Sequence, residues 1–230
     1  MKLSSVTLFI LAIIPIISLP QSNSPQSPVE ISGEHHHHPT FENQFVRVWD
    51  VTVPAGEATL WHIHRQDNVV VSCGEVNLRI ETLGRDPVES PWKFGEVRFS
   101  KATYVHRAIN VGTTNFHNFT IELLKPTAFL PDAAKLPSEP GREPLLENDR
   151  VRVYRVSLGP GESSGMHTHP LPGLGVMITA GAIAITTEGN ATPERVEITR
   201  PDVRWRAGAV RHSIRNIGIT RFEAVDIEIK

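Results

Sequence analysis

The amino-acid sequence predicts an all-β fold made of two tandem domains, each a sandwich or a barrel. Residues 41–64 repeat without gaps as residues 146–169, about 105 positions later. This period is far longer than the roughly 20 to 50 residues of solenoids and propellers, so each copy is expected to be a complete domain. Short runs rich in β-branched and aromatic residues alternate with Gly and Pro, and no stretch keeps a helical period with proper caps.

The repeat also defines the expected domain boundaries. Residues 96–112 align without gaps to residues 202–218, so the similarity continues toward the end of each copy. We expect the first domain over residues 41–125 and the second over residues 145–230. Residues 126–144 contain five prolines, which predicts an interdomain connector. The strands predicted in the first copy lie at residues 45–53, 60–64, 69–73, 76–82, 97–99, 105–110 and 116–124.

The chain begins with a segment typical of export. Residues 1–20 combine Lys2 with a long apolar run, which predicts a signal peptide and a secreted or periplasmic protein. The alternative is an uncleaved N-terminal membrane anchor, although Pro15 interrupts the run and its length is below the roughly 20 residues of a spanning helix. Residues 21–40 predict a disordered linker, whose four histidines (35–38) we interpret as a solvated end rather than a metal-storage tract.

The charge balance argues against two classes of partner. With 23 basic and 25 acidic residues, the formal net charge is −2, so there is no basic field for nucleic acid and no polybasic patch for anionic lipid. The only cysteine, Cys73, lies in an apolar run and is expected to be a buried hydrophobe, and an intrachain disulfide is excluded. A small-molecule substrate is the expected partner, and the oligomeric state stays open.

Each copy carries three histidines in a pattern that predicts a metal site. Successive side chains of a strand alternate between its faces, so the histidines of a His-x-His segment share one face. A third histidine follows downstream in each copy. Any one of these residues could be an ordinary core histidine, but three imidazoles that converge in a barrel are better satisfied by a divalent ion. The predicted ligands are His62, His64 and His106 in the first copy and His167, His169 and His212 in the second.

These motifs resemble a known family. Gly-x5-His-x-His, a glycine shortly afterwards, and His-x3-Asn-x-Gly are similar to the two conserved motifs of the cupin superfamily, and the resemblance covers both copies. It implies a bicupin, in which two jelly-roll barrels each hold a metal ion. The family's acidic ligand is replaced by the shorter Asp67 in the first copy and by Leu174 in the second. Asp67 is therefore a candidate fourth ligand, with a solvated loop residue as the alternative.

Three further residues are candidates for catalysis. Tyr104 precedes the third histidine by two residues and is expected to share its face as a hydrogen-bond donor. His117 and Glu223 occupy equivalent positions on the last strand of each copy, and their face is expected to point into the barrel because its other members are apolar. The alternative for both is that this end of the strand has emerged into solvent.

Open positions on a three-histidine ion suit oxygen chemistry or substrate chelation, so a metal-dependent enzyme is the first functional hypothesis. By resemblance, three-histidine iron cupins are often dioxygenases, and those with an added carboxylate include manganese oxalate enzymes. Iron or manganese is therefore expected, while zinc, nickel and copper are also compatible. The alternatives are a metal-dependent isomerase or decarboxylase, or a non-catalytic extracytoplasmic binding protein. We expect the first copy to be the redox or acid–base centre, because only it combines Asp67, Tyr104 and His117.

Overall fold

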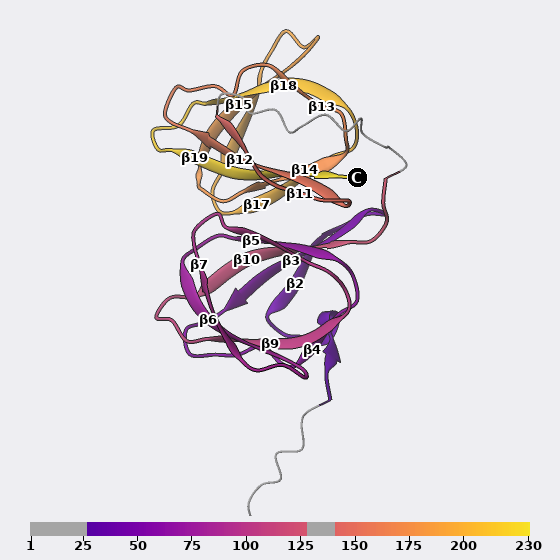
Figure 1. The fold of residues 1–230 in the computed structure, drawn as a ribbon. Coiled ribbons are helices and arrows are strands. Elements are labelled where there is room, and N and C mark those ends of the chain that lie inside the picture. The colour runs from indigo at the N-terminus through magenta and orange to yellow at the C-terminus, as the bar shows by residue number, and fades with distance from the viewer. Residues whose placement is uncertain (1–26, 128–140) are drawn as a thin grey trace, which may run out of the picture.

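The computed structural model describes residues 27–127 and 141–230, and it confirms an all-β fold of two tandem barrels (Figure 1). Apart from one 3-10 turn, η1 (Ile31–Gly33), the elements are strands, and no described helix is long and apolar enough to cross a membrane. The predicted signal peptide or anchor lies outside the described residues.

The first barrel is built from ten strands in two sheets of five, ordered β1-β4-β9-β6-β7 and β2-β3-β10-β5-β8. Strands distant in sequence lie side by side in both sheets, which is the connectivity of a jelly roll. Their bounds are β1 (Val29–Glu30), β2 (His37–Glu42), β3 (Val46–Val53), β4 (His62–His64), β5 (Asn68–Ser72), β6 (Val76–Thr82), β7 (Val88–Trp92), β8 (Val97–Ser100), β9 (Tyr104–Asn110) and β10 (Phe116–Leu123).

The second barrel repeats this plan with nine strands, in sheets ordered β11-β12-β19-β14-β17 and β13-β18-β15-β16. Its strands pair as their counterparts do, except that no described strand corresponds to β1. Their bounds are β11 (Arg142–Glu147), β12 (Val151–Leu158), β13 (His167–His169), β14 (Gly173–Met177), β15 (Gly181–Thr187), β16 (Glu194–Ile198), β17 (Asp202–Arg206), β18 (Val210–Asn216) and β19 (Phe222–Ile229).

The two barrels share one hydrophobic core. The sheet that contains β3, β5 and β10 faces the sheet that contains β12, β14 and β19, and side chains from both form a single buried cluster (Figure 1). Cys73 packs at the edge of this cluster, where burial and the nearby Asp50 carboxylate raise the pKa of its thiol to about 12. The members of the cluster from the last strand of each copy are Phe119, Ile121, Leu123, Val225, Ile227 and Ile229.

This shared core corrects the predicted orientation of the last strands. Phe119, Ile121 and Leu123 were expected to point into the barrel, but they point toward the other barrel. The alternate residues Asn118 and Thr120 line the barrel cavity instead. Because β10 is buried on both faces, its apolar alternation does not tell which face is inside the barrel.

The segment predicted as a disordered linker is structured from Val29 onward. β1 pairs in parallel with β4, and β2 pairs with β3, while Ile31 packs into the core of the first barrel. The polar composition of the segment suggested disorder, but Glu34, His36 and His37 are buried, so the histidine run is only partly solvated. The predicted connector is likewise shorter than expected, because residues 142–144 belong to β11.

Candidate metal centres

The first barrel brings its three histidines together at one point. His62 and His64 lie on the same face of β4, and His106 on β9 is the direct cross-strand partner of His62. Every pair of their Nε2 atoms is 3.1 Å apart. The alternation of the strand and the register of one strand pair therefore create the site.

The chemistry of this triad fits a bound cation. The Leu60 carbonyl accepts a hydrogen bond from Nδ1 of His62 at 2.8 Å, which leaves the Nε2 lone pair of the neutral ring directed at its neighbours. Burial lowers the pKa of His62 to about 4 and holds the pKa values of His64 and His106 well below the usual value. Neutral rings so close together cannot satisfy one another fully, whereas one divalent ion satisfies all three.

The spacing of the nitrogen atoms also fits a shared ion. Two nitrogen donors about 2.1 Å from one ion lie roughly 3.0 to 3.4 Å apart in the common geometries. The observed 3.1 Å falls within this range. The three histidines could therefore hold one ion together, and such an ion would have positions open for other ligands.

A cavity of about 190 Å³ lies next to the triad. Its walls are mostly apolar, with Trp92 and Phe116 among them. Tyr104 lines it as expected, because its ring stacks on His64 with centroids 4.7 Å apart. The Asn68 amide donates to the Tyr104 hydroxyl at 3.0 Å, and burial raises the pKa of the phenol. The structure therefore places Tyr104 beside the candidate metal position.

Asp67 is not at this site. Its carboxylate accepts hydrogen bonds from the Ala102 backbone N–H at 2.9 Å and from Arg150 of the second barrel at 3.0 Å. The expectation of a carboxylate ligand is therefore wrong, because the short side chain is used to link the two barrels.

His117 and Glu223 are also absent from the residues that line the two cavities. His117 lies 2.8 Å from Asp50, and Glu223 accepts a hydrogen bond from Ser157 at 2.7 Å. Both residues share the strand face that turns toward the other barrel, so the structure does not place them at the cavity walls where they were expected. The first copy was expected to be the redox centre because of Asp67, Tyr104 and His117. Of these three residues, only Tyr104 lies beside the triad.

The N-terminal segment supplies two residues that the sequence analysis missed. His37 on β2 is buried, lines the first cavity, and lies with its ring centroid 4.8 Å from that of His62. Its Nδ1 is 2.5 Å from the carboxylate of Glu34, which is 1% exposed. Burial alone would raise the pKa of Glu34, but hydrogen bonds from His37 and from two backbone N–H groups lower it to about 2. The repeat could have drawn attention to His37. Extending the alignment toward the N-terminus at the same offset pairs His37 with Arg142 of the second copy, which is also buried.

The second barrel repeats the triad with β13 and β18. Nε2 of His169 lies 2.9 Å from that of His167 and 3.0 Å from that of His212. The Gly165 carbonyl accepts a hydrogen bond from Nδ1 of His167 at 3.1 Å. Burial, aided by His169, lowers the pKa of His212 to about 3. This triad therefore fits the same kind of ion as the first.

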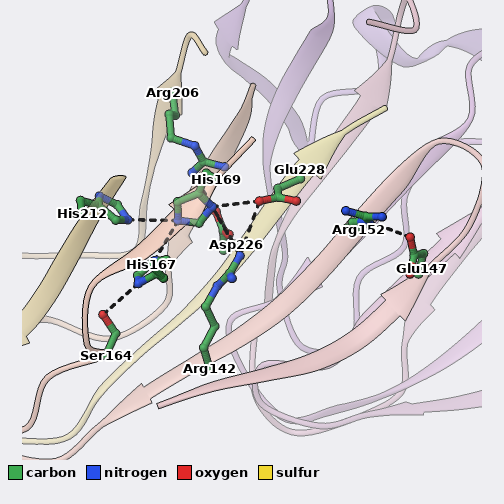
Figure 2. A network of polar contacts seen from close by, with 10 residues as sticks. All are labelled: Arg142, Glu147, Arg152, Ser164, His167, His169, Arg206, His212, Asp226 and Glu228. Atoms are coloured by element: carbon green, nitrogen blue, oxygen red, sulfur yellow. Dashed lines mark hydrogen bonds and ion pairs between the residues drawn. The ribbon is translucent and has the colours of Figure 1, made fainter. Parts of the chain in front are cut away.

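Its surroundings differ from those of the first site, because two buried carboxylates lie directly beside a histidine of the triad (Figure 2). Nδ1 of His169 lies 3.0 Å from Glu228 and 3.2 Å from Asp226. Arg142 and Arg206 each contact Asp226, at 2.9 and 3.0 Å. Burial disfavours the charged His169, yet these carboxylates outweigh it and raise its pKa. The acids were missed because they lie on the β19 face that was expected to point outward.

The second cavity is larger, about 290 Å³, and more polar. Arg142, Arg204 and Arg206 line it together with the histidine triad. The two candidate centres are therefore similar in their ligands and different in their cavities.

Similar solved structures share this architecture. The oxalate decarboxylase of Bacillus subtilis matches with a TM-score of 0.60 and 11% identity, over 84% of this chain and 74% of that one. AerE from Microcystis aeruginosa matches with a TM-score of 0.56 and 13% identity, over 88% and 98%. A cupin 2 conserved barrel domain protein from Leptotrichia buccalis matches with a TM-score of 0.50 and 12% identity, over 84% and 88%.

Sequence comparison adds nothing to this likeness, since no family model and no curated protein matches the chain. At these identities the solved structures demonstrate the fold alone. The repeat, the two motifs and the shared architecture agree, and the chain therefore has the fold of the cupin superfamily, with two cupin barrels in one polypeptide.

Proposed function

We propose that the protein is a metal-dependent oxidoreductase, dioxygenase-like, that acts on a small molecule in the first barrel. One observation carries the proposal: three neutral imidazole nitrogens converge beside a largely apolar cavity. His62, His64 and His106 would hold iron or manganese, and such an ion supplies open positions for oxygen and for a chelating substrate.

The surrounding residues support this use. The Leu60 carbonyl fixes the tautomer of His62, so that its Nε2 atom is available to the ion. Tyr104, held by Asn68, offers a hydroxyl group next to the triad that can orient a polar atom of the substrate. Trp92 and Phe116 give the cavity an apolar wall, which suits the apolar part of a small organic substrate.

The test has two stages. Metal analysis of the purified protein should find close to two ions per chain, and His62→Ala combined with His167→Ala should remove both. Oxygen uptake is then measured with a panel of phenols, diketones and small acids. Uptake that needs the metal and is lost in His64→Ala but not in His169→Ala would support the proposal, whereas an unchanged metal content in the double variant would refute it.

A second candidate reaction belongs to the second barrel. Three arginines line its cavity against two carboxylates, Glu194 and Asp226, and this excess of positive charge favours an anionic substrate such as a small carboxylic acid. A metal-dependent decarboxylase or isomerase fits this cavity, and the solved neighbours include oxalate decarboxylases. Product formation from a carboxylic acid without net oxygen consumption, abolished by His169→Ala, would identify this activity. Ion binding without turnover of any compound in the panel would instead indicate a non-catalytic binding protein.

We further propose that the protein acts outside the cytoplasm, because residues 1–20 have the composition of a signal peptide. Cell fractionation and N-terminal sequencing of the mature chain test this location. A full-length chain in the cytoplasmic fraction would refute export, and a full-length chain in the membrane fraction would indicate the N-terminal anchor.

A further inference from the structure

We propose that His37 is a fourth imidazole ligand of the metal ion in the first barrel. The inference rests on the proposed metal site and adds to it a ligand from the N-terminal segment, outside the two motifs that carry the other histidines.

The position of the ring is the first argument. One ring nitrogen each from His37, His62 and His64 lie within 4.8 Å of one another. The ring centroid of His37 is 4.8 Å from that of His62 and 6.2 Å from that of His64. The triad's own centroids are 4.6 to 5.0 Å apart, so His37 stands at ligand spacing from its nearest neighbour. It also lines the same cavity as the triad.

The contact with Glu34 is the second argument. A ligating histidine usually donates its other ring N–H to a carboxylate or a carbonyl group, which fixes its tautomer and makes it a better donor to the metal. Nδ1 of His37 lies 2.5 Å from Glu34, so this nitrogen carries the proton and Nε2 is the atom that can bind an ion. The backbone N–H groups of His36 and Leu60 donate to the same carboxylate at 3.0 and 3.2 Å and hold it in place.

The third argument is that no carboxylate competes for the position. Asp67 is bound to Arg150, and the buried acids Glu34 and Glu122 are already engaged, by His37 and by Trp49 respectively. A neutral imidazole can therefore complete the site without adding negative charge, which gives an all-nitrogen environment.

The second barrel supplies a natural contrast. His37 pairs with Val51 on β3, and Arg142 pairs with Val156 on β12, so the two residues occupy equivalent positions. A guanidinium group stays protonated and cannot ligate a metal. Arg142 instead bonds Asp226 and lies over the Tyr154 ring at 3.6 Å. The fourth imidazole is thus confined to the first site.

The experiment counts imidazole ligands directly. The full mature protein is loaded with Cu²⁺, and pulsed electron paramagnetic resonance detects the remote nitrogen of each coordinated ring. We expect a four-imidazole component and a three-imidazole component in the native protein. His37→Gln, which removes the ring but keeps a polar side chain, should remove the four-imidazole component and weaken ion binding at the first site about tenfold or more. His38→Gln is the matched control, because His38 is the exposed next residue in the run and should change neither measurement.

Each outcome is decisive. A native spectrum with only three-imidazole components overturns the inference without any variant, so a misfolded His37→Gln protein cannot leave it untested. A His37→Gln spectrum identical to the native one also overturns it, even though two ions still bind and the proposed metal sites stand. If the native protein binds no ion at all, the proposed function fails together with the inference.

Discussion

A few buried charged residues fix the position of His169 in the second site. Asp226 and Glu228 are buried beside His169, and burying a carboxylate is costly unless it is paired. The guanidinium groups of Arg142 and Arg206 contact Asp226 from two sides, and together with His169 they hold the pKa of that carboxyl well below its usual range although the residue is buried. The pairing keeps the Asp226 carboxylate ionised and close to Nδ1 of His169, away from the metal-facing nitrogen.

Removing one of these charged partners should therefore destabilise the folded protein strongly. We expect Arg142→Met to lower the free energy of unfolding by about 3–5 kcal/mol, because it leaves buried carboxylates uncompensated. Arg211→Met is the control, since Arg211 and its partner Glu188 are both exposed and such pairs contribute about 1 kcal/mol or less. Urea denaturation measures both variants, and equal losses of stability would show that the buried charges are not coupled as described.

At the scale of elements, strand alternation made much of each site predictable. The His-x-His segments and the third histidines converge as expected, because a two-residue period and one cross-strand register determine their placement. The orientation of β10 and β19 was not predictable from the pattern, since both of their faces are buried. The placement of His37 and Glu34 beside the first site was also not predictable, because the contacts that order the N-terminal segment are made by residues distant in sequence.

The order of this N-terminal segment should depend on Ile31, which packs with Trp49 and Leu78 inside the first barrel. Truncation of a buried Ile to Ala costs about 2 kcal/mol or more, which corresponds to roughly a thirtyfold increase in local opening. We expect Ile31→Ala to speed amide exchange across β1 and β2 while β19 stays protected. Val88→Ala, at an exposed position of β7, should leave exchange in the segment unchanged. Unaltered exchange in Ile31→Ala would mean that other contacts hold the segment.

At the scale of the whole molecule, the two barrels are joined by more than a connector. The shared hydrophobic cluster draws side chains from both, Asp67 bonds Arg150 across the interface, and the Thr127 backbone N–H donates to the Lys230 carbonyl at 2.9 Å. Separating the barrels would expose apolar side chains from both facing sheets.

The protein should consequently unfold in one transition. Differential scanning calorimetry should give equal calorimetric and van't Hoff enthalpies for the native chain. Ile121→Asp places a charge in the shared cluster, where Ile121 is fully buried, and should lower the melting temperature of both barrels. Two separate transitions in the native protein would contradict this coupling.

The shared core joins corresponding sheets of the two copies, which is the arrangement of a symmetric homodimer whose subunits have been fused. In a homodimer one gene encodes both subunits, so any substitution appears in both sites at once. Fusion into a single polypeptide removes that constraint. One copy can then keep a histidine at position 37 while the other carries an arginine at position 142, so that gene duplication allows two chemically distinct centres within one folded unit.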